Sequence, residues 1–365
     1  MRRPRSLVPV ALSLVTGLLV LSAGACGGDD EGDSVPQTGN VPTTEATTTS
    51  SSVGSGSGTT TSADDTGGAD EGAFPLTVEA ANGAVQLAAK PKRIVSLSPT
   101  ATEMLYAIGA ADQVVAVDDE SDYPEGTPRS GTLSAVAPSV DAIVAQRPDL
   151  VLVHLDNAGV VAGLAERQVP VLHLPAAEKL DDSYAQLDQL GRATGHGPEA
   201  TSVVEKMKGD IQQLLAQVPA RPTPVRIYHE IDGDLFTTTS ATFIGELYRL
   251  AGLENIADGS GDGSGYPQIS NDRVLDRDPD WIFVAHAPAG TDALGLLAGR
   301  NGWTGLRAVQ ANQVVQLDPE IASRWGPRTV DLLRTILTTT SATPGAPAPE
   351  AAPAGEPAAP DPAAA

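Results

Sequence analysis

The sequence has 365 residues and a strong acidic excess, with 23 lysines and arginines against 46 aspartates and glutamates and a formal net charge of −23 at pH 7. Nucleic-acid binding is excluded as a function, because it needs a basic face that this sequence does not offer. Disulfide bonds within the chain are excluded as well, since it contains one cysteine, so core burial or a ligand must stabilise the fold.

The first 25 residues are typical of a secretory signal peptide. Arginines at the start precede an apolar run over 7–21, and the small residues of 22–25 follow. The run is about 15 residues long, shorter than the roughly 20 that span a bilayer. Cys26 comes next, and the segment resembles the lipobox of bacterial lipoproteins, in which this thiol is lipidated, although Ala23 stands where that pattern has Leu, Val or Ile. We predict a protein anchored through Cys26 to the outer face of the cytoplasmic membrane; secretion with an incidental cysteine is the alternative.

Two terminal segments have the composition of disordered chain. Residues 26–73 contain Gly, Ser, Thr, Asp and Glu and almost no large apolar side chains, so they cannot bury enough surface to offset their ordering entropy. This segment is predicted to be a flexible tether, and the Pro/Ala-rich residues 341–365 a disordered tail. The folded part is therefore expected over about 74–340, which suffices for a large core or two ordinary domains.

Strand-like and helix-like segments alternate along this folded part. Several strand-like segments are continuous Val/Ile/Leu runs, as in strands that are covered on both faces. The alternation predicts an α/β fold with largely parallel sheets. The expected strands cover 93–97, 114–117, 150–154, 169–174, 225–231, 280–286 and 313–317, and the expected helices cover 100–108, 140–145, 160–167, 243–250 and 292–297.

One long helix is predicted between two α/β halves. Residues 198–218 have apolar side chains at i, i+3 and i+4 spacing, with Pro198 suited to the first turn and Glu199 complementing the helix dipole. A helix of this length is a rod of roughly 30 Å. We predict an amino-terminal lobe over 74–197, a bridging helix over 198–218 and a carboxy-terminal lobe over 219–340; a long helix inside one larger domain is the alternative.

The sequence of residues 93–124 predicts a strand, then a turn and then a helix. The strand is expected to end at Leu97, Ser98-Pro99 to turn the chain, and Thr100 with Glu103 to form a capping box. Gly109 is expected to end the helix. In open α/β sheets, ligands bind beyond the carboxyl ends of strands. The helix start at 98–102 and the loop 119–123 are therefore predicted rim elements of a binding site.

This strand, Ser-Pro turn and Thr-Glu helix, followed by Ser-Asp-Tyr-Pro, resembles the Fe/B12 periplasmic-binding family. The resemblance spans residues 90–335 and continues through the blocks 146–151, 242–246, 251–256, 267–270 and 324–328. It implies two Rossmann-like lobes bridged by one long helix, with ligand held between them. It also implies a solute receptor of an ABC importer for corrinoids, ferric siderophores or haem.

The blocks look most similar to those of vitamin B12-binding receptors. The resemblance implies that loop 119–123, the end of strand 150–154 and segment 320–324 face the ligand. His154 and Glu120 stand where the B12 receptor has aromatic residues, for which Tyr266 and Trp325 could compensate, and Arg324 matches an arginine of that receptor's site. The full set of expected ligand-site residues is Ser98, Pro99, Thr100, Glu120, Tyr123, His154, His229, Tyr266, His286, Glu320, Arg324 and Trp325.

A binding receptor for a cobalt or iron chelate is thus the leading function, with a corrinoid favoured and a ferric siderophore or haem as alternatives. No catalytic residue, resident cofactor or protein-bound metal is expected, because the sequence has no P-loop lysine, no Gly-x-Ser-x-Gly elbow and no catalytic cysteine. His154, His229 and His286 each fall near a predicted strand end. The rival function is a cell-surface metal-dependent hydrolase that uses His154, His229 and Asp156.

The resemblance also implies a membrane permease as partner, with a monomeric receptor. Receptors of this family dock on their permease through one acidic residue per lobe. The candidates are Asp156 or Glu166 in the first lobe and Glu246 or Glu254 in the second, and for each the simpler alternative is a solvated helix residue.

Overall fold

The computed structural model describes residues 74–341, apart from 219, 262 and 289. All of these belong to one compact unit. The predicted signal peptide, Cys26, the tether and the tail beyond residue 341 lie outside the described residues. Within the described part of the chain, no helix combines the length and apolar character that crossing a membrane requires.

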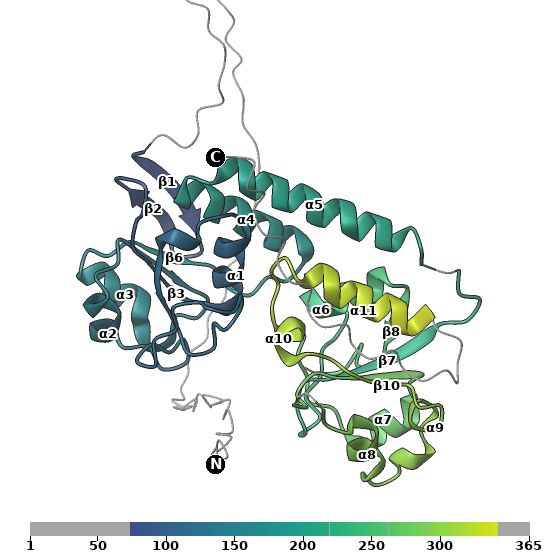
Figure 1. Cartoon of the computed structure of the whole chain (residues 1–365). Helices are drawn as coiled ribbons and strands as arrows, with labels where there is room; N and C mark the ends of the chain where they lie inside the picture. The colour runs from purple at the N-terminus through teal and green to yellow at the C-terminus, as the bar shows by residue number, and fades with distance from the viewer. Residues whose placement is uncertain (1–73, 219, 262, 289, 342–365) are drawn as a thin grey trace, which may run out of the picture. The chain divides into compact units, whose positions relative to one another are not determined.

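The first lobe (74–194) is built on a four-stranded parallel sheet in the order β4-β3-β5-β6. Figure 1 labels two of these strands, β3 and β6. Helices on both faces bury its strands, which accounts for their largely apolar sequences. Val95 and Leu97 pack among the residues of α2 and α3, whereas Ile94 and Leu152 pack among those of α1 and α4. The elements are β3 (Ile94–Leu97), α1 (Pro99–Ala107), β4 (Val114–Val117), α2 (Val140–Ala145), β5 (Leu150–Val153), α3 (Val160–Glu166), β6 (Val171–His173) and α4 (Leu180–Thr194), with short 3-10 turns η1 (Ala111–Gln113) and η2 (Asn157–Gly159).

An antiparallel hairpin precedes this sheet and is not among the predicted elements. Its strands β1 (Leu76–Ala80) and β2 (Gly83–Leu87) pair from Leu76 with Leu87 to Ala80 with Gly83. Alternate side chains are buried, and β1 packs against α4. The turn consists of Ala81 and Asn82, and Gly83 follows it with a φ of 97°, a backbone conformation that favours glycine.

The second lobe (225–341) repeats the architecture with the parallel strand order β10-β9-β7-β8. Phe283 packs on one face in the same cluster as residues of α6 and α11, and Ile282 packs on the other with residues of α7 and α8. Its elements are β7 (Val225–Glu230), α6 (Phe243–Leu250), β8 (Leu253–Asn255), α7 (Asn271–Arg277), β9 (Trp281–Val284), α8 (Ala293–Ala298), η3 (Trp303–Gly305), α9 (Arg307–Gln310), β10 (Val314–Gln316), α10 (Pro319–Ser323) and α11 (Thr329–Ser341).

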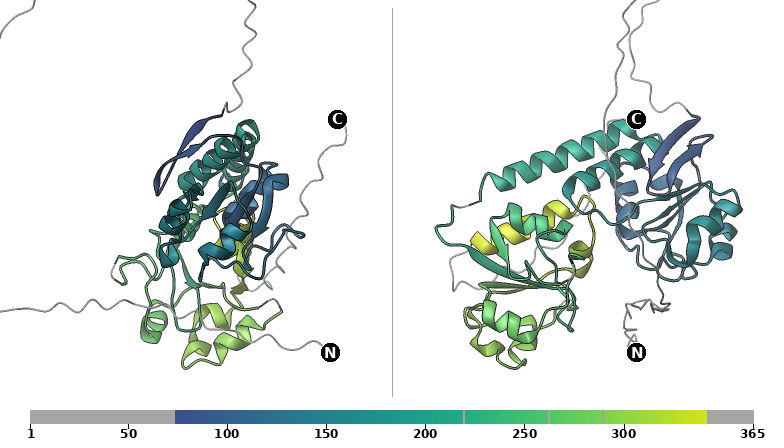
Figure 2. Two further views of the ribbon diagram at one scale, coloured as in Figure 1. Left: turned by 90° about the vertical axis from the view of Figure 1, so that its left-hand side faces the viewer. Right: turned by 180° about the vertical axis from the view of Figure 1, so that it is seen from behind.

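A single long helix, α5 (Gly197–Leu215), connects the two lobes in sequence. It packs against α4 of the first lobe and α11 of the second, and Figure 2 shows α5 alongside α4 from behind. Its buried stripe has helical spacing and consists of Ala200, Val204, Met207 and Ile211. Pro198 and Glu199 occupy the first turn as expected.

The predicted α/β class, with parallel sheets and one long bridging helix, is confirmed. The predicted strands and helices match observed ones to within three residues at each end. The hairpin, β8, α4, α7, α9, α10 and α11 are observed in addition, together with the short 3-10 turns. The exact limits 74–197, 198–218 and 219–340 assigned to the lobes and helix stay predictions.

Candidate functional site at the strand ends

The carboxyl ends of the strands carry most of the polar residues that the sequence singles out. Ser98 follows β3, Asp118 follows β4 and His154 follows β5. In the second lobe, His286 lies two residues beyond β9, and segment 318–324 follows β10. Because all strands within each sheet are parallel, these residues gather at one edge of their sheet.

Helix α1 starts differently from the prediction. Ser98 is the N-cap, and its hydroxyl accepts a hydrogen bond from the Ala101 amide at 3.2 Å. The expected capping box between Thr100 and Glu103 is wrong, because Glu103 lies in the second turn and its carboxylate bonds to arginines instead. Ser98 and Thr100 are almost fully buried, so they shape the start of α1 rather than present side chains at a surface.

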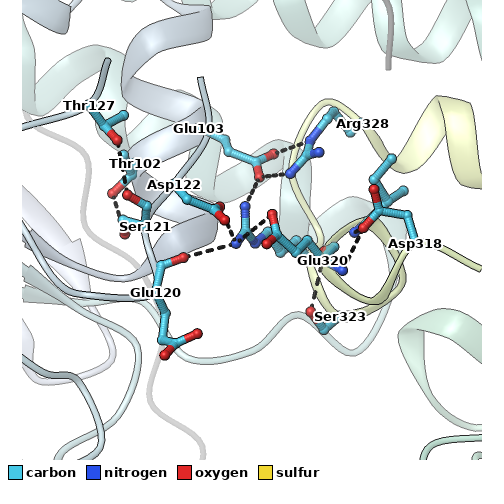
Figure 3. Close-up of polar contacts among 12 residues, drawn as sticks. Thr102, Glu103, Glu120, Ser121, Asp122, Thr127, Asp318, Glu320, Ser323 and Arg328 are labelled. Carbon is cyan, nitrogen blue, oxygen red and sulfur yellow. Dashed lines mark hydrogen bonds and ion pairs between the residues drawn. The ribbon is translucent and has the colours of Figure 1, made fainter. Parts of the chain in front are cut away.

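Glu103 is the centre of a buried ion-pair network that joins the two lobes (Figure 3). Its Oε1 accepts from Arg324 Nη1 at 2.7 Å, and its Oε2 accepts from Arg328 Nε at 3.1 Å. Arg328 Nη2 donates to Oε1 as well. The exposed fractions are 3% for Glu103 and 8% for each arginine. One carboxylate of α1 thus holds two guanidinium groups from the segment between α10 and α11.

Arg324 also bonds to the loop that follows β4. Its Nη2 donates to the Glu120 carbonyl at 3.0 Å and to Asp122 Oδ1 at 2.9 Å, and lies 3.3 Å from Glu320 Oε2. Loop 119–123 and segment 320–324, which are both expected to face the ligand, therefore contact each other in this structure. The guanidinium of Arg324, expected to face ligand, is occupied by protein acceptors in this structure.

The carboxyl groups of Asp122 and Glu320 meet at Arg324 and have opposite pKa shifts. Burial and a hydrogen bond with Asp122 raise the pKa of Glu320 to about 7. Burial alone would raise the pKa of Asp122, but hydrogen bonds from Glu320 and Arg324 outweigh it and lower that pKa. The contact between the two carboxyl groups thus favours the neutral form of Glu320 and the ionised form of Asp122.

The loop after β4 is pinned to α1 by buried hydroxyl groups. Ser121 and Thr102 hydrogen-bond through their side chains at 3.0 Å, and the Ser121 amide donates to Asp118 Oδ1 at 2.8 Å. Asp118 is fully buried, and burial raises the pKa of its carboxyl group to about 6. Further along the loop, the Tyr123 ring lies 4.0 Å from the Arg328 guanidinium carbon, a cation–π contact. The loop therefore presents a fixed backbone to Arg324.

His154 and Trp325 come together from different lobes. Their ring centroids are 6.3 Å apart. His154 Nδ1 lies 2.9 Å from the Leu97 carbonyl, which only accepts, so Nδ1 carries the proton. Burial lowers the pKa of His154. Trp325 donates through Nε1 to Gln186 and accepts at its carbonyl from Ser183, so this contact is anchored to α4.

The other predicted residues lie apart from this group. His229 is 1% exposed and hydrogen-bonds to the Tyr248 hydroxyl at 2.8 Å, and burial lowers its pKa to about 4. It is a core histidine in this structure. Tyr266 is 45% exposed, on a loop that hydrogen-bonds to the segment after β7. His286 pairs with Glu230 at 2.7 Å.

The described residues offer no metal centre for the hydrolase alternative. His154 is bonded to a backbone carbonyl and His229 to Tyr248, while Asp156 accepts from the Val161 amide at the start of α3. Among the described residues, no three His, Cys, Asp or Glu groups are placed to hold a metal ion. The sequence-based grouping of these three residues is therefore wrong.

The acidic candidates for permease contact differ in availability. Asp156, Glu166 and Glu254 are exposed. Glu246 is half-buried, accepts from the Leu180 amide at 2.8 Å and pairs with Arg249. Its carboxylate links α6 to the amino end of α4, which is an internal contact between the lobes.

A cavity of about 520 Å³ lies elsewhere, at the amino ends of the second sheet. Val225 and Trp281, the first residues of β7 and β9, line it together with Arg307. Arg307 is already paired with Asp278 and Asp280. This cavity is at the opposite sheet edge from the network around Glu103, so it is not the candidate site.

Known proteins match the part of this chain that contains both parallel sheets. A family model described as periplasmic binding protein matches residues 94–321. The chain is 29% identical over 269 residues to an uncharacterised ABC transporter substrate-binding lipoprotein of Bacillus subtilis, covering 71% of this chain and 83% of that protein. It is 33% identical over 212 residues to the vitamin B12-binding protein of Pectobacterium atrosepticum, covering 54% and 72%. The crystal structure of the periplasmic vitamin B12-binding protein of Vibrio cholerae matches with a TM-score of 0.58 at 26% identity, covering 69% and 97%.

Proposed function

Because the chain belongs to the periplasmic binding protein family, we propose that it is the extracytoplasmic substrate-binding protein of an ABC importer. It captures a metal chelate, with a corrinoid such as cobalamin favoured, and delivers it to a membrane permease. The relatives named for vitamin B12 binding support the corrinoid. A ferric siderophore or haem is the alternative cargo, and the organic part of the cargo is bound without covalent change.

The observation that carries this function is the meeting of two sheet edges. Residues after β4 contact residues after β10 through Arg324, and the residue after β5 contacts Trp325. A ligand between these edges would be flanked by Glu120, Tyr123 and His154 from the first lobe. Tyr266, His286, Glu320 and Trp325 would flank it from the second. Affinity then comes from surface buried between two preformed walls, with a few polar groups fixing orientation.

Arg324 is assigned a positioning role in this proposal. Its hydrogen bonds to the Glu120 carbonyl and Asp122 hold the rim loop of the first lobe in place. Ser98, Pro99 and Thr100 support the same rim by starting α1. His229 lies too deep to contact a ligand directly.

Delivery of the cargo requires contact with a permease and attachment of the protein to the membrane. The exposed carboxylates of Asp156 or Glu166 and of Glu254 are proposed to dock on basic groups of the permease. Glu246 is the weakest candidate because its carboxylate already bonds to the Leu180 amide. Lipidation at Cys26 would hold the monomeric receptor at the outer face of the cytoplasmic membrane.

The experiment that tests this function is a calorimetric titration of the purified protein with cyanocobalamin, a panel of ferric siderophores and haemin. We expect saturable one-to-one binding of cyanocobalamin that is tighter than binding of the other ligands. Replacing Trp325 with Phe should weaken it, whereas replacing Trp281, which is buried at the amino end of β9, with Phe should leave affinity unchanged. Preferential binding of a siderophore or haemin would reassign the cargo, and binding of none of them would refute the receptor function proposed.

A further inference from the structure

Glu230 is the centre of a second buried polar cluster, distinct from the network around Glu103. It is the last residue of β7 and is fully buried. Its two oxygens accept from both terminal nitrogens of Arg300, with Nη2 to Oε1 at 2.9 Å. Oε1 also accepts from His286 Nε2 at 2.7 Å. Arg300 in turn lies over the Trp303 ring at 4.6 Å, so the carboxylate is held rigidly.

This cluster fixes the tautomer of His286. A carboxylate only accepts hydrogen bonds, so the proton facing Glu230 is on Nε2, and in the neutral ring the lone pair is on Nδ1. No other described residue hydrogen-bonds to Nδ1. The side chain is 24% exposed, whereas Glu230 beneath it is not exposed at all. A histidine oriented by a carboxylate through one nitrogen is the arrangement that makes the other nitrogen a good metal ligand.

His286 lies at the sheet edge where the ligand site is proposed. β9 lies between β10 and β7 in the sheet, and His286 follows its carboxyl end. The segment after the neighbouring β10 contains Arg324, which contacts the first lobe. His154 also has one nitrogen bonded, but to a backbone carbonyl, and its ring packs against Trp325. His286 is therefore the histidine with both carboxylate support and an unpartnered nitrogen.

We propose that His286 Nδ1 coordinates the metal of the bound chelate as an axial ligand, with Glu230 and Arg300 as its positioning residues. This inference rests on the proposed function. One histidine cannot hold a bare ion, and no larger ligand cluster occurs among the described residues. It suffices for a planar chelate whose macrocycle supplies the other donors.

The inference specifies the class of cargo. A corrinoid or porphyrin metal with an exchangeable axial position accepts the imidazole nitrogen, whereas a siderophore that fills all six positions does not. With aquocobalamin, the bond from cobalt to water breaks as the bond from cobalt to Nδ1 forms, water leaves, and the oxidation state of cobalt is unchanged. In cyanocobalamin, cyanide occupies that position and blocks the exchange.

The test compares aquocobalamin with cyanocobalamin as probes, by visible absorption and by affinity. The unaltered protein should shift the aquocobalamin bands to longer wavelength and bind it at least about tenfold more tightly than cyanocobalamin. In His286→Ala both the shift and the preference should disappear. The control His196→Ala, which changes a histidine at the start of α5, should retain both. In the unaltered protein labelled with 15N-histidine, the Nδ1 resonance of one histidine should move on binding, a readout that needs no variant.

The outcomes separate this inference from the proposed function. Binding of both cobalamins without a spectral shift would overturn axial ligation and leave the receptor function standing. A shift that persists in His286→Ala and is lost in His154→Ala would overturn the assignment to His286. Failure to bind either cobalamin would overturn both the corrinoid assignment and this inference.

Discussion

Contact between the two lobes depends most on one residue, Glu103. Changing Glu103 to Gln leaves Arg324 and Arg328 charged, buried and without their shared carboxylate. Removing one partner of a buried ion pair costs about 3–5 kcal/mol. We therefore expect Glu103→Gln to lower the free energy of unfolding by this amount, as measured by urea denaturation.

The control for this prediction is an ion pair on the surface. Asp141 pairs with Arg167 at 2.9 Å, and both side chains are more than half exposed. Asp141→Asn should change the unfolding free energy by less than about 1 kcal/mol. Equal effects of the two substitutions would contradict the importance given to the network around Glu103.

Glu320 makes stability depend on pH. Its pKa of about 7 in the folded protein lies above the ordinary value of 4.5. The folded state therefore holds a proton that the unfolded state has lost between these values, and the unfolding free energy falls as pH rises from about 4.5 to 7. In Glu320→Gln this loss is absent. We therefore expect the unfolding free energy of the variant to rise relative to that of the unaltered protein as pH rises across that range. The gain should be roughly 1 kcal/mol, because solvent screens a side chain that is 43% exposed.

Thermal denaturation from pH 5 to 8 checks this expectation. Asp118, whose pKa is raised to about 6, contributes a dependence of the same sign, but it is present in both proteins and cancels in the difference. Parallel curves for the two proteins would show that Glu320 does not titrate in this range.

The residues of the site could be predicted from sequence only where a local pattern reports them. Arg324 and Glu320 can be predicted because their sequence block resembles that of the family. Glu103 was assigned to a capping box, because the Thr-x-x-Glu spacing is the same whether the carboxylate caps or pairs; its partners lie 221 and 225 positions away. Arg300 had no local signal, since it is 70 positions from Glu230.

At the scale of elements, the close approach of α4 and α5 requires a glycine. A Cβ on Gly191 would clash with the Ala200 Cβ and lie 3.0 Å from the His196 carbonyl. Gly191→Ala should therefore destabilise the protein by about 1–3 kcal/mol through overpacking. Gly209, inside α5, has nothing within 4 Å of the same position. Gly209→Ala should stabilise by about 0.5–1 kcal/mol, because alanine loses less backbone entropy in a helix.

The two variants form a matched pair for chemical denaturation, since each adds one methyl group to a helix. Opposite signs are predicted. A stabilising Gly191→Ala would mean that α4 and α5 can separate at no cost, which would contradict a rigid connection between the lobes.

The elements that could be predicted are those whose core is apolar. Strands β5 and β9, which lie inside their sheets, are continuous apolar runs because helices cover both faces. Helices α4 and α11 were not predicted, although their apolar residues have helical spacing, and their buried faces also contain small and polar residues. The buried residues of this kind are Ser183, Gln186, Gly191, Thr194, Thr329, Thr339 and Thr340.

At the scale of the whole molecule, the α/β alternation and the long amphipathic stretch suffice to predict two parallel sheets joined by α5. They do not predict which side chains meet across the lobes, because those contacts depend on packing between segments far apart in sequence. The network at Glu103, the contact of His154 with Trp325 and the bond from Leu180 to Glu246 are all of this kind.

The most direct test of a chelate bound between the two sheet edges is the position of its metal. A crystal of the protein grown with aquocobalamin, measured at the cobalt absorption edge, gives that position without reference to side chains. We predict one anomalous peak between the carboxyl ends of the two sheets, within bonding distance of His286 Nδ1. A peak at the amino ends of the strands, or at any surface remote from Trp325, would contradict the account.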